Sequence, residues 1–333
     1  MNIFLTLDYE LFFGNPTGSV EKCMLEPTQR LLDLSQKYGV NMTYFVDVGY
    51  LLACERFMET FPQLKEDYGK VIDQVKSIVA QGSDVQLHIH PHWEDCSYSD
   101  EGWKMITDKH YKLADFSDEE IFPLVKRYKE KLEEIIDRTV NSFRAGGWCL
   151  QPFTKVEKTF QKLGIKFDTT VFQGGEFSSA HYSFDFRNAP DKGRYNFQSN
   201  LIKENPDGYF TEVPIGGIKY HPLFYWQLYG WGRLRPSRHK MLGDGNFIAQ
   251  PGRKQKHLTK SSWNHISMDG YFSSKLLSAT RKFAKEGRSD LVIIGHPKSM
   301  TLFSFERLET YIQRMQKKHR FLTFQELGND SRK

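Results

Sequence analysis

The sequence predicts an α/β fold in which parallel strands form a distorted barrel surrounded by helices. Short, continuously apolar runs alternate with amphipathic segments along the 333 residues, which is typical of a parallel sheet covered by helices. Seven or eight such units at this chain length favour a (β/α)7-8 barrel over an open sheet. No internal repeat and no linker interrupts the pattern. We therefore expect one domain over residues 1–333.

Short runs rich in β-branched and aromatic residues mark the strands. In order along the chain, the expected strands are 2–8, 40–48, 84–90, 140–146, 164–171, 208–215, 290–296 and 319–327. Apolar residues at i, i+3 and i+4 mark the helices between them, and Gly39 and Gly82 end two of these. The expected helices are 27–39, 69–82, 118–139, 153–163, 272–287 and 304–318.

Two long segments, 172–207 and 216–270, do not fit the alternation and are expected to be loop insertions. The second holds the aromatic run HPLFYWQLYGWGRL, followed by a basic patch. Residues 221–260 contain eight lysines and arginines and one acidic residue. Long loops in a compact domain usually carry function, so phosphate groups or acidic sugars are expected partners there. Nucleic acid is not expected, because the positive charge is confined to this segment.

Composition restricts the class of protein. Hydrophobic residues at 39% and charged residues at 26% exclude a disordered or fibrous chain. No apolar stretch is long enough for a transmembrane helix. The opening MNIFLTLDYE lacks a basic leader, and the four cysteines show no paired spacing, which favours reduced thiols. We expect a cytoplasmic protein, with peripheral membrane association left open.

Polar side chains follow the expected strands at the ends that meet on one rim of a parallel barrel. These residues are Asp8, Glu10, His88, His90, His92, Arg144, Asp168, Glu212 and His296. The same pattern on most strands indicates an active site at that rim.

The run HIHPHW is the most specific of these features. His88 and His92 are four residues apart, and Pro91 forces the chain out of the strand between them. Two imidazoles and a carboxylate from another strand can hold Zn²⁺ or another divalent transition metal; otherwise these histidines are ordinary polar rim residues. Asp8 and Glu10 point to the same side of their strand, which suits one base and one ligand, although Asp8 can also cap a turn.

The segments LTLDYE, HIHPHW, FRAGGW, GIKFDTTV and VIIGHPKSM, in this order, resemble the motifs of the polysaccharide deacetylases. This family is also called NodB-like or carbohydrate esterase family 4. The resemblance runs from residue 3 to about 301 and is weak over 172–270. LHIHPHW, FRAGGW and IIGHPKS look closest to a WbmS-like branch associated with bacterial surface polysaccharide synthesis. The resemblance implies a metal-dependent hydrolase that removes an N-acetyl group from an N-acetylated carbohydrate, which can be anionic and nucleotide- or lipid-linked.

The resemblance also implies roles for individual residues. Asp8 would be the base that deprotonates the attacking water, Arg144 would orient Asp8, and His296 would protonate the departing amine. His88 and His92 would bind the metal. The implied substrate contacts are Gly147, Trp148, Asp168 and Trp93.

Two departures from the family pattern affect these roles. Tyr9 replaces the second of two adjacent aspartates, so Glu10 is expected as the third ligand, with His90 as an alternative ligand. FRAGGW lacks the usual proline, which leaves the oxyanion geometry open. The missing aspartate also allows a non-catalytic glycan-binding relative. Two histidines and a carboxylate describe iron-dependent oxygenases too, but those enzymes usually have antiparallel folds.

Overall fold

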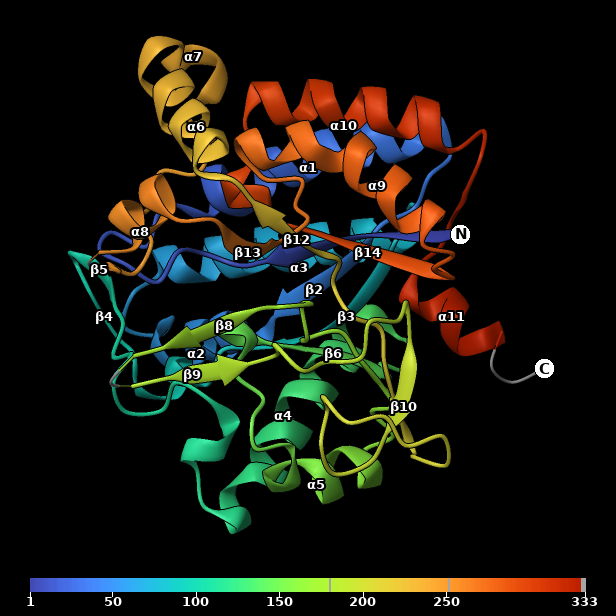
Figure 1. Ribbon diagram of the computed structural model, residues 1–333. Coiled ribbons are helices and arrows are strands. Elements are labelled where there is room, and N and C mark those ends of the chain that lie inside the picture. Colours follow the sequence, from blue (N-terminus) through green and yellow to red (C-terminus); the bar gives the residue numbers. More distant parts are fainter. Residues whose placement is uncertain (180, 251, 331–333) are drawn as a thin grey trace.

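The computed structural model describes residues 1–179, 181–250 and 252–330, and its centre is a curled, mainly parallel sheet (Figure 1). Neighbouring strands pair in parallel except for the antiparallel edge pair β10–β11. In spatial order the strands are β10 (Tyr195–Phe197), β11 (Phe210–Glu212), β7 (Phe167–Asp168), β6 (Ser142–Ala145), β3 (Asp84–Ile89), β2 (Thr43–Asp47), β1 (Asn2–Tyr9) and β14 (Asp290–Gly295).

The two sides of this sheet meet just beyond β11. Ile215 forms parallel bridges with both Phe172 and Val292, and the amide of Gly216 donates to the carbonyl of Val292 at 2.9 Å. Since Val292 lies in β14, the sheet curls into a distorted barrel. The predicted fold class is therefore confirmed.

Helices cover the outside of the sheet, and one buried apolar core runs from Ile3 to Leu327. The covering helices are α1 (Glu26–Tyr38), α2 (Val48–Phe57), α3 (Gln63–Ala80), α4 (Asp118–Ile136), α5 (Glu157–Lys162), α9 (Leu276–Lys285) and α10 (Leu302–Met315). Helix α2 was not predicted, because VGYLLACERF is apolar on most sides and lacks a polar stripe. A small hairpin follows β3 and consists of β4 (Ser97–Ser99) and β5 (Gly102–Lys104).

The prediction of a strand over 319–327 is wrong beyond Phe321. Within this segment, β15 (Arg320–Phe321) pairs with β1, and the helix α11 (Phe324–Asp330) begins three residues later. The Thr323 amide donates to the Glu326 carboxylate at 2.7 Å, and the Glu326 amide donates to the Thr323 hydroxyl at 3.3 Å. This reciprocal capping of a T-x-x-E sequence begins a helix.

The two insertions are also more ordered than expected. The first contains the hairpin β8 (Glu176–Ser178) and β9 (Ser183–Asp185) in addition to β10. In the second, β12 (Gly217–Tyr220) pairs with β13 (Ser262–His265). The helices α6 (Pro222–Leu234), α7 (Pro236–His239) and α8 (Arg253–Thr259) lie between these strands. Figure 1 shows α6 and α7 projecting from one end of the barrel.

Two of the expectations from the sequence concern the cellular compartment of the protein. The cysteines Cys23, Cys54, Cys96 and Cys149 are all free and buried. Within the described residues, no helix has both the length and the apolar character needed to cross a bilayer.

Candidate active site

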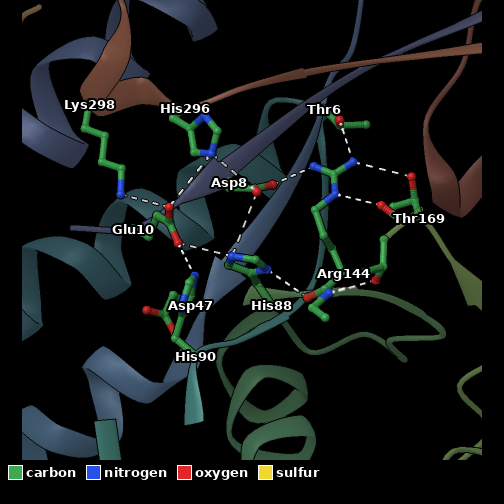
Figure 2. Close-up of polar contacts among 12 residues, drawn as sticks. Thr6, Asp8, Glu10, Asp47, His88, His90, Arg144, Thr169, His296 and Lys298 are labelled. Carbon is green, nitrogen blue, oxygen red and sulfur yellow. Dashed lines mark hydrogen bonds and ion pairs between the residues drawn. The ribbon is translucent and has the colours of Figure 1, made fainter. Parts of the chain in front are cut away.

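The ends of β1, β3, β6 and β14 bring the chemically reactive side chains together, as Figure 2 shows. Asp8 lies in β1 and Glu10 follows it; His88 lies in β3 and His90 follows it. Because side chains two apart on a strand share a face, each pair points to the same side. Arg144 is paired in register with His88, so the basic and acidic groups converge.

Asp8 is held by a buried arginine. Arg144 Nη1 donates to Asp8 Oδ1 at 2.5 Å, Nη2 donates to the Thr6 hydroxyl at 2.8 Å, and Nε donates to the Thr169 carbonyl at 3.1 Å. Both charged side chains are almost inaccessible to solvent. Burial alone would raise the pKa of Asp8, but Arg144 and nearby histidines lower it below its usual value. The guanidinium therefore keeps this carboxylate ionised.

Glu10, His88 and His90 form a compact group of potential metal ligands. One ligand atom from each lies within 4.8 Å of the others. Glu10 Oε2 is 3.1 Å from His88 Nε2 and 2.7 Å from His90 Nε2. All three side chains are buried. Imidazole nitrogens and a carboxylate oxygen are ligands that Zn²⁺ and related divalent ions accept.

The hydrogen bonds of His88 show why this group fits a cation. Its Nδ1 lies 2.8 Å from the Arg144 carbonyl, which is an acceptor only, so Nδ1 carries the proton. A neutral His88 would then aim the Nε2 lone pair at the Glu10 carboxylate, which is unfavourable unless a proton or a metal ion lies between them. Without a metal the carboxylates raise the pKa of His88 to about 9 against the effect of burial.

His92, one of the two predicted ligands in HIHPHW, lies outside this group. Its ring packs against Phe13 and Tyr111, with centroid separations of 4.5 Å and 5.8 Å. Neither ring nitrogen has a hydrogen-bond partner among the described residues, and burial lowers its pKa well below the usual value. The turn at Pro91–Asp95 carries His92 away, while His90 keeps the strand parity of His88.

His296 is oriented by a carboxylate that the sequence interpretation missed. Its Nδ1 lies 2.7 Å from Asp269 Oδ2, and its backbone amide donates to Asp269 Oδ1 at 2.7 Å. The opposite nitrogen, Nε2, is 3.6 Å from Asp8 Oδ2. Burial lowers the pKa of His296, but Asp269 and Asp8 outweigh it and raise the pKa above its usual value. In the sequence, the signal for Asp269 was the alternation of apolar and polar residues in ISMD, the segment that ends at Asp269.

Lys298 is a second residue that the sequence interpretation missed. Its side chain is only 4% exposed, and Nζ donates to Glu10 Oε1 at 2.8 Å and to the Leu11 carbonyl at 2.5 Å. These bonds fix one carboxylate oxygen of Glu10 and leave the other facing the histidines (Figure 2). Lys298 follows His296 by two residues in IIGHPKS, which was the only hint of its place.

The four predicted substrate contacts divide into two groups. Gly147 and Trp148 line a cavity of about 1120 Å³ beside the site. Trp93 does not, because its side chain is completely buried and its indole N–H donates to Asp47 at 2.5 Å. Asp168 instead accepts bonds from the amide and hydroxyl of Thr170.

The pair Asp168 and Glu212 forms a second acidic cluster, and the charge of Arg144 acts on both carboxyls. The two residues are register partners in β7 and β11, and both are buried. Burial raises the pKa of both carboxyls, and that of Glu212 rises furthest because Asp168 adds to the effect. The raised pKa of Glu212 favours its protonated form, and neither carboxyl belongs to the group of potential metal ligands.

Comparisons with known proteins bear on the fold. No protein-family model matches the sequence, and no curated protein matches it. A protein of Mycobacterium smegmatis that is assigned to the polysaccharide deacetylases has a similar structure, with a TM-score of 0.55, 14% identity, and 99% of this chain and 90% of that chain covered.

Two further structures are more distant. The Xyl-CE4 domain of a xylanase from the hindgut metagenome of Trinervitermes trinervoides has a TM-score of 0.40 at 11% identity, over 99% of this chain and 90% of that one. A carbohydrate esterase family 4 pseudoenzyme from Bacillus anthracis has a TM-score of 0.43 at 13% identity, over 98% of this chain and 64% of that one. The WbmS-like branch stays a prediction. The Mycobacterium likeness shows that the chain has the polysaccharide deacetylase fold.

Proposed function

We propose that the protein is a metal-dependent N-deacetylase that hydrolyses the amide of an N-acetylated amino sugar in a bacterial surface glycan or its precursor. The observation that supports this most directly is the set of three neighbouring groups at one end of the barrel. A metal-ligand group, an ionised Asp8 held by Arg144, and His296 held by Asp269 lie within a few ångströms of one another.

We assign Glu10, His88 and His90 as the metal ligands, with Zn²⁺ as the preferred ion. His90 takes the place of His92 because only His90 shares the 4.8 Å group. A divalent ion bound here would lower the pKa of a coordinated water and polarise the acyl carbonyl. Lys298 donates a hydrogen bond to Oε1 of Glu10, the oxygen that does not face the histidines, and so fixes the orientation of the ligand carboxylate.

The remaining residues handle protons and charge. Asp8 accepts a proton from the attacking water through Oδ2, the oxygen not bonded to Arg144. The water oxygen bonds to the acyl carbon and the C–N bond breaks. His296 donates the Nε2 proton to the departing nitrogen, so that acetate and a free amine result. In this proposal a backbone N–H near Gly147 stabilises the developing oxyanion.

Free thiols favour a cytoplasmic location. Three exposed apolar side chains on α6 (Leu223, Trp226 and Leu234) are consistent with peripheral membrane contact. Both points are part of the proposal.

The first test is metal analysis of the purified protein beside two variants. We expect about one divalent ion per chain in the wild type, none in His88→Ala/His90→Ala, and an unchanged content in His92→Ala, because His92 lies outside the ligand group. Acetate release from N-acetylated oligosaccharides should follow the metal content.

The opposite results are equally informative. No metal in the wild type, even after zinc is added, contradicts the hydrolase and favours a non-catalytic glycan-binding protein. Metal loss in His92→Ala, with metal retained in His88→Ala/His90→Ala, contradicts the ligand assignment. Turnover that depends on dioxygen indicates the oxygenase alternative.

A further inference from the structure

The cavity beside the active site has walls from the two insertions. The hairpin β8–β9 forms one side, and α8 with β12 and β13 forms the other. The turn after β6 lies between the cavity and the metal-ligand group, because Gly147 lines the cavity while its neighbour Gly146 packs against the His90 ring. A molecule that fills the cavity therefore lies next to the metal-ligand group, on the other side of this turn.

Three lining cations have no ion-pair partner among the described residues. They are Lys219 on β12 and Arg253 and Lys256 on α8. By contrast, the fourth lining cation, Arg187, is paired with Asp185 at 2.6 Å and with Glu176 at 3.2 Å. The two lining acids are thus already neutralised in part, and the opposite wall carries uncompensated positive charge.

The same wall offers aromatic surface for a ring. Trp263 is 45% exposed, and its indole packs against Gly174, where a Cβ would lie 2.5 Å from the ring. Trp148 lines the cavity nearer the active site. His257, also in the lining, has its pKa lowered to about 4, first by burial and then by Arg253 and Lys256. The smaller part of that shift comes from the positive charge of these two side chains.

We propose that Lys219, Arg253 and Lys256 form an anion subsite that binds the phosphate or diphosphate group of a phosphorylated amino-sugar substrate. Lysine ammonium groups and an arginine fork are the donors that recognise phosphate oxygens, and the exposed indole of Trp263 provides a face for the attached ring. That the anion belongs to the substrate rests on the proposed deacetylase function; that the cavity binds the anion does not.

The test is a titration of the purified, metal-containing protein with inorganic pyrophosphate and with uridine diphosphate, followed by tryptophan fluorescence. We expect both to bind and Arg253→Gln/Lys256→Gln to weaken both by about tenfold or more, since charge-assisted bonds are lost. The matched control is Lys254→Gln/Lys260→Gln, which removes the same charge from the same segment. Neither residue lines the cavity, and Lys254 lies over the Tyr229 ring, so affinity should change less than about twofold.

The outcomes separate the possible sources of the anion. Tighter binding of uridine diphosphate than of pyrophosphate supports a nucleotide-linked substrate, and equal binding supports a lipid diphosphate. Binding that disappears after the metal is removed with a chelator places the anion on the metal and overturns the subsite. Equal losses in both double variants, or no binding at all, also overturn it. Because no turnover is measured, these results are independent of whether acetate is released.

Discussion

The two ring nitrogens of His296 face different carboxylates, and this arrangement determines its protonation. Nδ1 is 2.7 Å from Asp269, whereas Nε2 is 3.6 Å from Asp8. A proton on each nitrogen satisfies both carboxylates, so the charged imidazolium is favoured and its pKa is raised. A histidine in this state can donate the Nε2 proton without turning its ring.

Replacement of Asp269 should therefore change the pH dependence of turnover. In Asp269→Asn the negative charge beside Nδ1 is lost, so the pKa of His296 falls. The alkaline limb of the kcat profile, where the proton donor is lost, then moves to lower pH, and kcat above neutral pH falls about tenfold or more. Initial rates of acetate release between pH 5 and 9 measure this.

Asp95→Asn is the matched control, because Asp95 lies 2.7 Å from His110 outside the site. It should leave the profile unchanged. An Asp269→Asn profile that superimposes on the wild type would show that His296 is not the proton donor.

At the level of single residues, the sequence predicts which residue types gather at the site but not which of their atoms come into contact. Asp8, Glu10, His88 and Arg144 follow from strand-end position, since parallel strands end on the same rim. The choice between His90 and His92 depends on whether strand parity persists through His90. That parity is set by the backbone before Pro91, and spacing alone does not reveal it.

Among the elements, the turn after β6 packs closely against the metal-ligand group. Its single-turn helix spans Gly146–Trp148, and Gly147 adopts φ 58°. A Cβ on Gly146 would lie 2.5 Å from His90 Nδ1. The ring of His90 cannot move away freely, since its other nitrogen is 2.7 Å from Glu10. The glycine thus makes room for a ligand side chain.

Gly146→Ala should consequently weaken metal binding by about tenfold or more, the range seen when the support of a ligand is disturbed. Competition with a chromogenic chelator measures the affinity. Gly230→Ala is the control, because nothing lies within 4 Å of a Cβ there. It should bind metal normally and raise the free energy of unfolding by about 0.5–1 kcal/mol, since alanine is the better helix former. Wild-type affinity in Gly146→Ala would contradict the assignment of His90.

Elements with strong periodicity were predictable, and those set by tertiary contacts were not. The helix expected at 27–39 matches α1 closely. The insertion over 216–270 was expected to be a loop because it does not fit the alternation of strands and helices. In the structure, Phe224 and Tyr225 of α6 pack on Tyr220 and neighbouring rings, so the helix is stabilised by a small core that no local pattern shows.

For the whole molecule, the sequence predicts the number of β/α units but not how the sheet closes. The parallel alternation implies a barrel, whereas the closing contacts come from residues outside the predicted strand pairs, such as Ile215, which bridges Phe172 and Val292. Residues so far apart in the sequence meet only after the strands have taken their twist. Neither the register nor this contact can be derived from composition.

The same closure buries His265 among aromatic rings. Its ring lies 5.2 Å from that of Trp148 and 5.7 Å from that of Phe172, and its Nδ1 has no hydrogen-bond partner among the described residues. Burial, the largest effect, lowers the pKa of His265 from 6.5 to about 3. The native fold therefore holds this imidazole neutral well below the pH at which the unfolded chain would protonate it.

This makes the stability of the molecule pH-dependent with a definite sign. Above pH 6.5 both states are neutral at His265, and its contribution is fully present. As the pH falls toward 3, only the unfolded state takes up the proton, so the free energy of unfolding decreases by up to about 1.4 kcal/mol per pH unit.

His265→Phe removes this proton uptake. Relative to the wild type, the variant should gain about 2 kcal/mol between pH 7 and pH 5 in urea unfolding. The exposed His181, changed to Phe, should show no such gain, and parallel curves for His265→Phe and the wild type would mean that the folded imidazole protonates as readily as the unfolded one.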